Sequence, residues 1–518
     1  MALCAARSRP IRAGRRVVTT RCNAPAPTPR GRVAVVGAGI AGVAAALALR
    51  RRGYDAVVYE AQRAAEVPHA GITLSAAALA ALRRIDAQVA DAAIAAGDVI
   101  TTIVLRDLNG KPLAETRTGG SLDTDKAEPT LCLRWSELWR ILADALPADA
   151  LQFGHALEDF TDNSVGAHLT AEASRTVSGA PPVLAVFSHR DTFGQAAVPA
   201  AVIVGADGLR SKVRACAISF ATCPADRASA LTAQVRRLLF GAEPPPCDAG
   251  ATVWRGVIDS RAAPPGLCPH GAFVCCHAPD GRTLTIMSLG TGGSTLHDGS
   301  LSWVASLPSA VPPSGEAAPG NLAEAFVDLK QPASAEARTL AYLTHTPAMS
   351  LAEAAAAPLV ADRVRAAFAD FSDMPALLAA TPAGEIVERR LFYRATPDAA
   401  YCEDDDDELR HCNGVATLIG DAASMRLPAL GLGACLSLES AAELGDALGA
   451  LPAGAGAAGI AAALRSFEES QHRRARRAAR AALDEARRVA AAPVATIPAP
   501  GTGFQGWLLG NARRGKAV

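Results

Sequence analysis

The chain has 518 residues, of which 50% are hydrophobic and 20% are charged. Its 51 basic and 51 acidic residues balance, so composition gives no support to a nucleic acid or another polyanion as a partner. A chain of this length has room for two or three domains, or for one large α/β body that carries a smaller one.

Neither a membrane span nor a metal site is expected. No uninterrupted apolar run reaches about 18 residues, the length that a transmembrane helix needs. The 12 cysteines are scattered, without a CxxC pair or a Cys/His spacing typical of zinc. This pattern predicts free thiols in a reducing compartment.

The first 30 residues form a distinct segment. Residues 1–30 contain seven arginines and no acid, and the first acidic residue of the chain is Asp55. An Arg-rich, acid-poor start without an apolar core is typical of an organellar transit peptide. The stretch from Val17 to Ala24, followed by alanines and prolines, favours the chloroplast over the mitochondrion. A disordered basic tail is the alternative interpretation.

The strongest pattern follows. The apolar run Val33–Val36 predicts a buried parallel strand, and a helix is expected from about Gly39 to Arg52. A second strand, Ala56–Tyr59, ends at Glu60. The turn between the first strand and the helix reads Gly37-Ala38-Gly39-Ile40-Ala41-Gly42.

Each glycine of this turn has a physical reason in a dinucleotide site. Gly37 permits the tight turn, Gly39 lets a diphosphate approach the backbone, and Gly42 lets the helix pack against the strand. The amides of the helix N-terminus would face the phosphates, and Glu60 is placed to accept hydrogen bonds from an adenosine ribose. The sequence therefore predicts dinucleotide binding; a glycine-rich turn without a ligand is the alternative.

An arginine precedes the next clear helix. Ser136 is predicted to cap a helix whose Leu138, Ile141 and Leu142 face inward, which leaves Arg134 just before its N-terminus. Taken alone, Arg134 is interpreted as an ordinary solvated arginine.

A second buried strand ends in polar residues. The apolar run Ala200–Val204 leads into Asp207-Gly208 and a predicted basic helix. Polar groups at that position lie at the carboxyl edge of a parallel sheet, where ligands bind. A plain Asp-Gly turn is the alternative.

The middle of the chain has a different pattern. Candidate strands at Thr252–Ile258, Ala272–His277 and Thr283–Ser288 alternate with loops rich in proline and glycine. They predict a mainly antiparallel sheet, as expected of a substrate domain inserted into a nucleotide-binding one.

The last third of the chain returns to the first pattern. A strand ends at Gly420-Asp421, and a loop rich in proline and glycine leads to a helix that begins near Gly433. The positive end of that helix could face an anion or a developing negative charge; an ordinary surface loop is the alternative. A helix over Ile460–Ala492, rich in arginine, is expected to pack on the surface of the body, with a membrane or partner contact as the lesser possibility.

Three separated motifs together resemble one family. The glycine turn with Glu60, the Asp207-Gly208 segment, and Gly420-Asp421 with Pro428 and Gly431-Leu432-Gly433 occur in the order found in FAD-dependent aromatic hydroxylases, the group A flavoprotein monooxygenases. The segment from Arg134 to Leu142 is also similar to that family, as is Val253–Val257. The resemblance covers about residues 32–490.

The resemblance implies an α/β fold in which an FAD-binding Rossmann-like domain with a parallel sheet carries an inserted, mainly antiparallel substrate domain. The implied division is a transit-like segment at 1–30, FAD-binding parts at 31–222 (with minor substrate-domain strands) and 391–450, the substrate domain at 223–390, and a helical region and tail at 451–518.

The resemblance also implies roles for individual residues. The backbone from Gly37 to Gly42 would approach the FAD diphosphate, Glu60 would hold the adenosine ribose, and Arg134 would lie beside the diphosphate. Asp207 and Gly208 would serve FAD and NAD(P)H binding, and Asp421 would bind the ribityl chain. The remaining positions would border the flavin ring: Pro428, Gly431, Leu432, Gly433 and Ala434.

The implied reaction uses NAD(P)H and O2. The reduced flavin forms a C4a-hydroperoxyflavin that hydroxylates or epoxidises a small apolar, aromatic or isoprenoid-like substrate. The protein binds, orients and excludes water, so cofactor residues are predicted whereas catalytic residues are not, apart from Pro428 as a candidate near the flavin ring.

The chain departs from the family pattern near the expected flavin ring. Ser424 stands where histidine is common, Leu432 and Cys435 stand where glutamine and asparagine are common, and Ser440 stands where an acid is common. Glu439 is a candidate to replace that acid, although adjacent helical positions differ by about 100°.

Two other functions remain open at this point. One is an FAD-dependent oxidoreductase or reductase of the same fold that inserts no oxygen, and the other is a degenerate flavin-binding protein. They stay open because a fold does not decide a function. Oxygen consumption coupled to the substrate would distinguish a monooxygenase from both.

Overall fold

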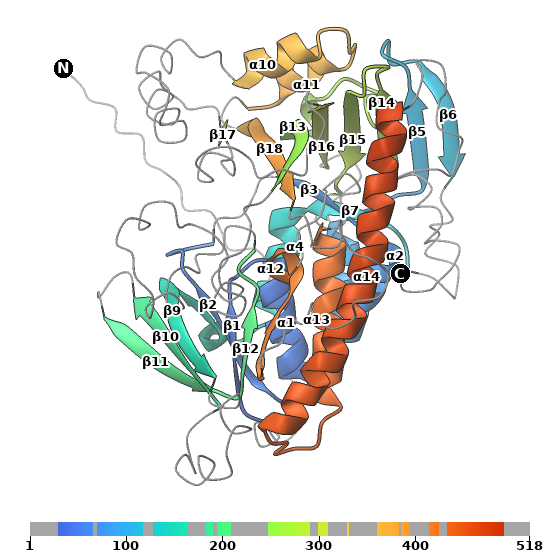
Figure 1. The fold of residues 1–518 in the computed structure, drawn as a ribbon. Coiled ribbons are helices and arrows are strands. Elements are labelled where there is room, and N and C mark those ends of the chain that lie inside the picture. The colour runs from blue at the N-terminus through green and yellow to red at the C-terminus, as the bar shows by residue number, and fades with distance from the viewer. Residues whose placement is uncertain are drawn as a thin grey trace, which may run out of the picture.

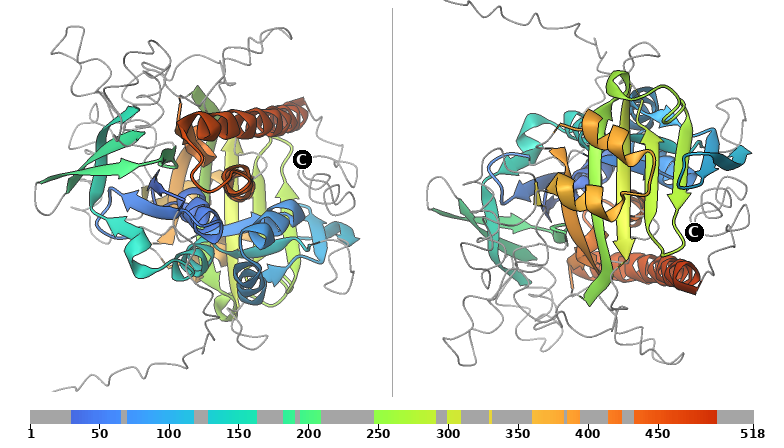
Figure 2. Two further views of the ribbon diagram at one scale, coloured as in Figure 1. Left: turned by 90° about the horizontal axis from the view of Figure 1, so that it is seen from below. Right: turned by 90° about the horizontal axis from the view of Figure 1, so that it is seen from above.

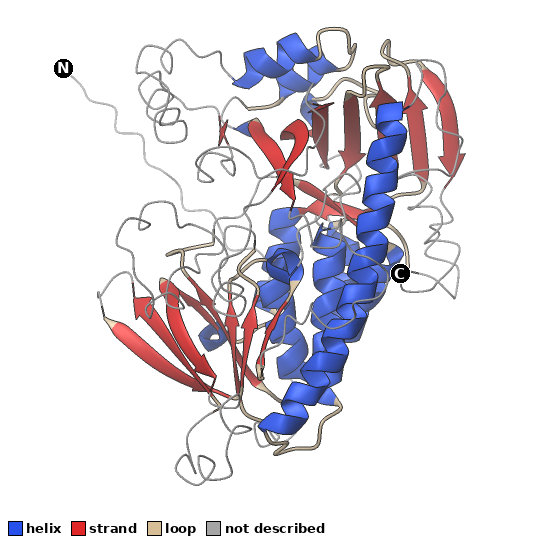
Figure 3. Ribbon diagram, in the orientation of Figure 1, coloured by secondary structure: helices blue, strands red, loops and turns tan. Residues whose placement is uncertain are grey.

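The protein is described by a computed structural model. The structure describes residues 30–65, 70–117, 128–162, 182–189, 194–208, 247–290, 299–308, 329–330, 360–382, 385–393, 414–423 and 433–491. Its chain order of helices and strands is shown in Figure 1, and Figure 3 separates the helices from the strands by colour.

A five-stranded parallel sheet forms the first layer. Its order is β19-β12-β1-β2-β8, with bounds Ala416–Leu418, Val202–Gly205, Arg32–Val36, Asp55–Glu60 and Leu151–Phe153. Strands β1, β12 and β19 bury every residue except Arg32, as expected of strands that are covered on both faces. Strand β12, far along the chain, thereby lies beside β1, and β19 lies beside β12.

Helices cover one side of this sheet and a small sheet covers the other. Helices α1 (Ile40–Arg51) and α13 (Gly433–Gly449) pack together on one side (Figure 1). The antiparallel sheet β11-β10-β9 lies on the other side, with bounds Gln195–Ala200, Val183–His189 and His155–Asp162. Phe187 of β10 stacks on Tyr59 of β2 with ring centroids 4.3 Å apart, so the two sheets share an apolar contact.

A larger sheet forms the second body. Its order is β17-β18-β13-β16-β15-β14-β5-β6, with bounds Leu329–Lys330, Val387–Tyr393, Cys247–Asp259, Ser300–Pro308, Thr283–Ser288, Ala272–His277, Thr102–Arg106 and Pro112–Arg117. All neighbouring pairs are antiparallel except β14 with β5. Helices α10 (Val360–Ala367) and α11 (Met374–Ala380) cover one face, where Trp254 and Trp303 are buried (Figure 2).

A small sheet and the helices α2, α3 and α4 connect the bodies. Its order is β3-β7-β4, with bounds Gly71–Leu74, Leu131–Arg134 and Asp98–Val99. Helices α2 (Ala76–Ile85) and α3 (Ala87–Ala96) follow β3, and α4 (Trp135–Asp144) follows β7. The Gly71 amide donates to Ser302 Oγ at 3.2 Å, so β3 is tied directly to the large sheet.

The architecture confirms the predicted α/β fold with an added antiparallel sheet. The strands expected in the middle of the chain form β13, β14 and β15, and the minor strands expected in the first part are β5 and β6. Two details of the prediction were wrong. Ser136 lies inside α4 and does not cap it, although Arg134 lies just before the helix as predicted. The run Ala200–Val204 is divided between β11, which ends at Ala200, and β12, which begins at Val202.

Helix α14 (Ala457–Ala491) begins beside α13 and extends toward the large sheet (Figure 1). Its Ile460, Leu464 and Phe467 are buried in the core, as expected of a helix packed on the body. Arg474, counted among the arginines of a surface helix, is 3% exposed, so that expectation was wrong for this residue. Among the described residues, no helix is long and apolar enough to cross a membrane.

Candidate functional site

The glycine turn joins β1 to α1 at the carboxyl edge of the parallel sheet. Gly37 has φ of 105°, and a Cβ there would lie 2.7 Å from the Ala206 carbonyl oxygen. A Cβ on Gly42 would lie 1.9 Å from the Gly37 oxygen. At Gly39, by contrast, a Cβ would meet no atom within 4 Å. Two of the glycines are therefore required by the fold, whereas the third keeps the approach to the turn open.

Both backbone polar groups of Ala38 are held by side chains. Its N–H donates to Glu60 Oε2 at 2.8 Å, and its carbonyl accepts from Trp139 Nε1 at 2.7 Å. Glu60 Oε1 also accepts from the Gln62 amide at 2.8 Å. Since no side chain caps the N-terminus of α1, whose N-cap is Gly39, the turn presents backbone amides in a fixed conformation. Ile40 and Ala41 begin the helix and are buried.

The Asp207-Gly208 segment lies directly against this turn. The Ala206 amide donates to the Val36 carbonyl at 2.8 Å, which continues the pairing of β12 with β1. Asp207 and Gly208 follow it, and both are half-buried. No atom of the described residues lies within 4 Å of the Cβ position of Gly208. The structure thus brings the first two predicted motifs together; the basic helix expected after Gly208 lies outside the described residues.

The third motif meets the first through α1. The Ile419 amide donates to the Gly205 carbonyl at 2.9 Å, and the chain turns at Gly420. A Cβ on Gly420 would lie 2.8 Å from Ala41 Cβ and 3.2 Å from Ser437 Oγ, so only glycine fits between α1 and α13. Asp421, in the short helix α12 (Gly420–Ala423), is exposed.

The N-terminus of α13 lies beside that aspartate. A Cβ on Gly433 would be 3.9 Å from Asp421 Oδ1, and Ala434 is the next residue of the helix. The predicted positions Pro428, Gly431 and Leu432 and the departure at Ser424 lie outside the described residues.

Arg134 lies at the junction of the two bodies rather than in solvent. It is half-buried, and its Nε and Nη2 lie 3.2 and 2.5 Å from Ser300 Oγ of β16. The interpretation as an ordinary solvated arginine is therefore wrong, whereas its role beside a diphosphate stays a prediction.

Cys435 links the start of α13 to the β3–α2 junction. Its Sγ donates to the Thr73 carbonyl at 3.3 Å and accepts from the Ser75 amide at 3.4 Å. Burial raises the pKa of this thiol to about 11, so it is protonated at neutral pH. The Cys435 side chain is thus occupied by two backbone groups.

Glu439 and Ser440, the two positions considered for an acid in α13, are both buried. Glu439 is 6% exposed, and its Oε2 lies 3.6 Å from Arg474 Nε of α14. Ser440 is 4% exposed. Because Glu439 faces α14, it does not take over the position of the acid that is common at Ser440.

The described residues fit an FAD molecule at this edge. A Cβ at Gly39 would enter the space that a diphosphate needs, while the open N-terminus of α1 offers amide donors. Among the described residues, no group of three or more His, Cys, Asp and Glu side chains could hold a metal ion.

Sequence reasoning missed three residues of this region. Trp139 holds the glycine turn, Ser300 contacts Arg134, and Ser437 limits the space at Gly420. No motif marks them, because each acts across elements that are distant in sequence. Only the amphipathic pattern of α4 would have placed Trp139 near the core.

Comparison with known sequences supports the assignment of the first motif. Residues 30–235 match the family described as FAD binding domain. A 3-amino-4-hydroxybenzoate 2-monooxygenase from Streptomyces cremeus is 34% identical over 126 residues, which cover 24% of this chain and 32% of that protein. The match thus spans about a third of the relative's length.

Comparison with solved structures concerns the fold. HpxO of Klebsiella pneumoniae, solved with FAD and uric acid, superposes with a TM-score of 0.58 at 18% identity and 88% coverage of both chains. The 2,6-dihydroxypyridine-3-hydroxylase of Arthrobacter nicotinovorans superposes with a TM-score of 0.57 at 17% identity, covering 92% of this chain and 97% of that one. The resemblance of this chain to FAD-dependent aromatic hydroxylases is confirmed at the level of the fold.

Proposed function

We propose that this chain, which has the fold of the FAD-dependent aromatic hydroxylases and an FAD binding domain beginning at residue 30, is an FAD-dependent monooxygenase. One observation carries the proposal. The glycine turn, the Asp207-Gly208 segment and the Gly420-Asp421 segment meet at one sheet edge, although more than 160 residues separate the first two and more than 200 the last two. Of the three glycines in the turn, only Gly39 leaves its Cβ position open.

The described residues have distinct tasks in this proposal. The backbone from Gly37 to Gly42 lies against the diphosphate, with the amides at the N-terminus of α1 as the donors, and Glu60 holds the adenosine ribose while it also accepts from the Ala38 amide. Asp207 and Gly208 contact the cofactor from β12, and Asp421 binds the ribityl chain. The N-terminus of α13, from Gly433 and Ala434, stabilises negative charge on the flavin ring.

FAD, when bound, supplies the chemistry: it takes electrons from NAD(P)H and activates O2, so that one oxygen atom enters the substrate and the other leaves as water. The chain itself orients the substrate and excludes water. Val257, Phe273 and Met287 of the large sheet pack with Cys132 of β7 in a buried apolar cluster that joins the two bodies. The substrate we propose is a small apolar or aromatic compound.

The names of similar proteins support the same substrate class. The Streptomyces relative is named for an aminohydroxybenzoate, and the two solved structures are named for uric acid and a dihydroxypyridine. Each of these is a small ring compound. An isoprenoid-like substrate is the alternative class.

The first test is the visible absorption spectrum of the purified protein, with the released cofactor identified by chromatography. We expect one FAD per chain, and NADPH or NADH oxidation that a small aromatic substrate accelerates together with stoichiometric O2 consumption. A substrate that is reduced without O2 would indicate a reductase. FAD binding without any substrate-stimulated oxidation would indicate a degenerate flavin protein. A chain that cannot bind FAD would contradict the proposal.

Targeting is proposed separately, because residues 1–29 lie outside the described residues. We propose that the Arg-rich start directs the chain to the chloroplast. Residues 1–29 fused to a fluorescent protein should enter plastids, and import into mitochondria or a diffuse signal would contradict this.

A peripheral membrane contact of the arginine-rich part of α14 is testable by co-flotation with anionic vesicles.

A further inference from the structure

Helix α14 carries a polar stripe on its inward face. Glu468, Gln471 and Arg474 are 3%, 5% and 3% exposed. They are spaced by three residues, so they lie on one side of the helix. An amphipathic surface helix normally places apolar residues there. The polar stripe therefore needs a reason other than packing.

Two members of the polar stripe hold β19, the edge strand of the parallel sheet. Thr417 Oγ1 donates to Glu468 Oε1 at 2.6 Å, and Gln471 Nε2 donates to the Leu418 carbonyl at 3.1 Å. Among the described strands β19 pairs with β12 alone, and a side chain from α14 satisfies a backbone group on its other side. Leu418 precedes Asp421 by three residues.

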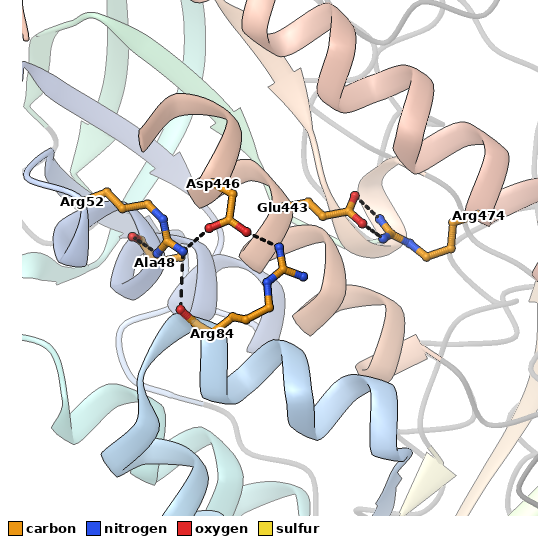
Figure 4. Close-up of polar contacts among 6 residues, drawn as sticks. All are labelled: Ala48, Arg52, Arg84, Glu443, Asp446 and Arg474. Carbon is orange, nitrogen blue, oxygen red and sulfur yellow. Dashed lines mark hydrogen bonds and ion pairs between the residues drawn. The ribbon is translucent and has the colours of Figure 1, made fainter. Parts of the chain in front are cut away.

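The third member holds α13. Both Nη atoms of Arg474 donate to the Glu443 carboxylate, one of them at 2.8 Å (Figure 4). The Nε of Arg474 lies 3.6 Å from Glu439 Oε2. Glu439 lies less than two turns after Gly433, where α13 begins. Removing one partner of a buried ion pair leaves an uncompensated charge, so this link resists displacement.

We propose that the polar stripe of α14 positions the flavin-facing elements, with Gln471 and Arg474 as positioning residues that touch no cofactor. The inference rests on the proposed FAD function. Gln471 holds the strand that carries Asp421, and Arg474 holds the helix whose N-terminus faces the flavin ring. Together they keep these two elements in register with α1, against which Gly420 leaves no free space.

The chain offers a matched control on the same helix. Asp446 lies three residues after Glu443 and pairs with Arg52, the residue that follows α1, and with Arg84 of α2 (Figure 4). This ion-pair group stabilises α13 near its C-terminus, away from Asp421 and Gly433. A second control is Thr381, whose buried hydroxyl accepts from Trp303 Nε1 at 2.9 Å in the other body.

The experiment compares five full-length variants, of which Arg474→Lys is a conservative replacement. Gln471→Met and Arg474→Met remove links from α14, while Thr381→Val and Asp446→Asn are their controls. For each variant, the melting temperature without added FAD, the Kd for FAD, and the visible absorption and circular dichroism of bound flavin are measured. We expect Gln471→Met and Arg474→Met to raise the Kd about tenfold or more, equal to about 1.4 kcal/mol, and to change the flavin spectrum.

The controls should lower the melting temperature yet leave the Kd within about twofold and the spectrum unchanged. Arg474→Lys should restore part of the affinity, because it keeps the charge but loses the bidentate geometry. If Arg474→Met does not fold, Gln471→Met decides, since it removes only one neutral hydrogen bond. The inference is overturned if Gln471→Met binds FAD with unchanged Kd and spectrum, or if all variants lose affinity in proportion to their melting temperatures. A wild-type chain that binds no FAD overturns the proposed function itself, and this inference with it.

Discussion

Gly39 and Gly42 differ in what a methyl group would meet. Gly39 has extended backbone angles, with φ of −69° and ψ of 176°, and its Cβ position is open. A Cβ added at Gly42 would lie only 1.9 Å from the Gly37 carbonyl oxygen. One position therefore tests ligand binding and the other tests the fold.

We expect Gly39→Ala to change the free energy of unfolding without FAD by at most about 1 kcal/mol, the scale of an N-cap substitution. The same variant should weaken FAD binding at least tenfold. Gly42→Ala should destabilise the chain by about 2–3 kcal/mol or more through overpacking. Urea unfolding and FAD titration measure both effects; equal destabilisation by the two variants would contradict this difference.

The position of Cys435 requires a side chain that both donates and accepts a hydrogen bond, as an asparagine can. Its thiol satisfies the Thr73 carbonyl and the Ser75 amide, and an asparagine amide offers both a donor and an acceptor. We expect Cys435→Asn to retain flavin binding and most stability. Cys435→Ala should cost about 1–3 kcal/mol, because it leaves both buried backbone groups without partners. Thermal unfolding of the two variants checks this, and an alanine variant as stable as wild type would argue against it.

The same thiol should resist alkylation. Burial raises the pKa of Cys435 to about 11 and that of Cys132 to about 12, so at pH 8 both are protonated and shielded. The thiolate is the reactive form. Mass spectrometry after brief iodoacetamide treatment of the native protein should find both unmodified, whereas labelling in urea should modify them.

At the scale of elements, Arg30 donates hydrogen bonds to carbonyl groups at the C-terminal end of α13, although the two are far apart in the sequence. Its Nη1 donates to the carbonyls of Gly449 and Leu451 at 2.9 and 2.6 Å, and its guanidinium lies 5.9 Å from the Tyr54 ring centroid. Cations at a helix C-terminus complement the helix dipole. Arg30 thus belongs to the folded body, although residues 1–30 were predicted as one separate segment.

Arg30→Ala should therefore reduce the free energy of unfolding by about 1–2 kcal/mol. Arg32 provides the control, because its side chain is 45% exposed in the ion pair with Asp55. Arg32→Ala should therefore reduce the free energy of unfolding by less than about 1 kcal/mol. Chemical denaturation distinguishes them, and a larger loss at Arg32 would refute the role given to Arg30.

At the scale of the whole molecule, the two bodies have separate cores. One core surrounds the parallel sheet and packs against Trp135 and Trp139, while another, between the large sheet and α10 and α11, contains Trp254 and Trp303. The motifs that meet at the sheet edge all belong to the first core. Ligand binding should therefore stabilise one body more than the other.

Saturation with FAD at about 100 times its Kd should stabilise the first body by about 2.7 kcal/mol. Hydrogen exchange followed by mass spectrometry should show slower exchange in α1, β12, β19 and α13 and little change in β13 to β16. Equal protection of both bodies would mean that they unfold as a single unit.

Local sequence patterns determined the elements and the motifs. The glycine spacing, the apolar strand before it and Glu60 after it act over fewer than 30 residues, so propensity and turn chemistry alone predict them. The same holds for the Asn109-Gly110 turn between β5 and β6, and for the start of α13 at Gly433. The order of three such motifs was enough to indicate the fold.

The tertiary structure alone decided which side chains act across elements. Trp139 reaches the glycine turn, Arg134 contacts Ser300, and Arg474 turns inward to Glu443 instead of lying on an arginine-rich surface. In each case the partners are separated by 31 to 166 residues. Such pairings depend on how sheets and helices pack, and the pattern of one segment carries no information about the surface of another.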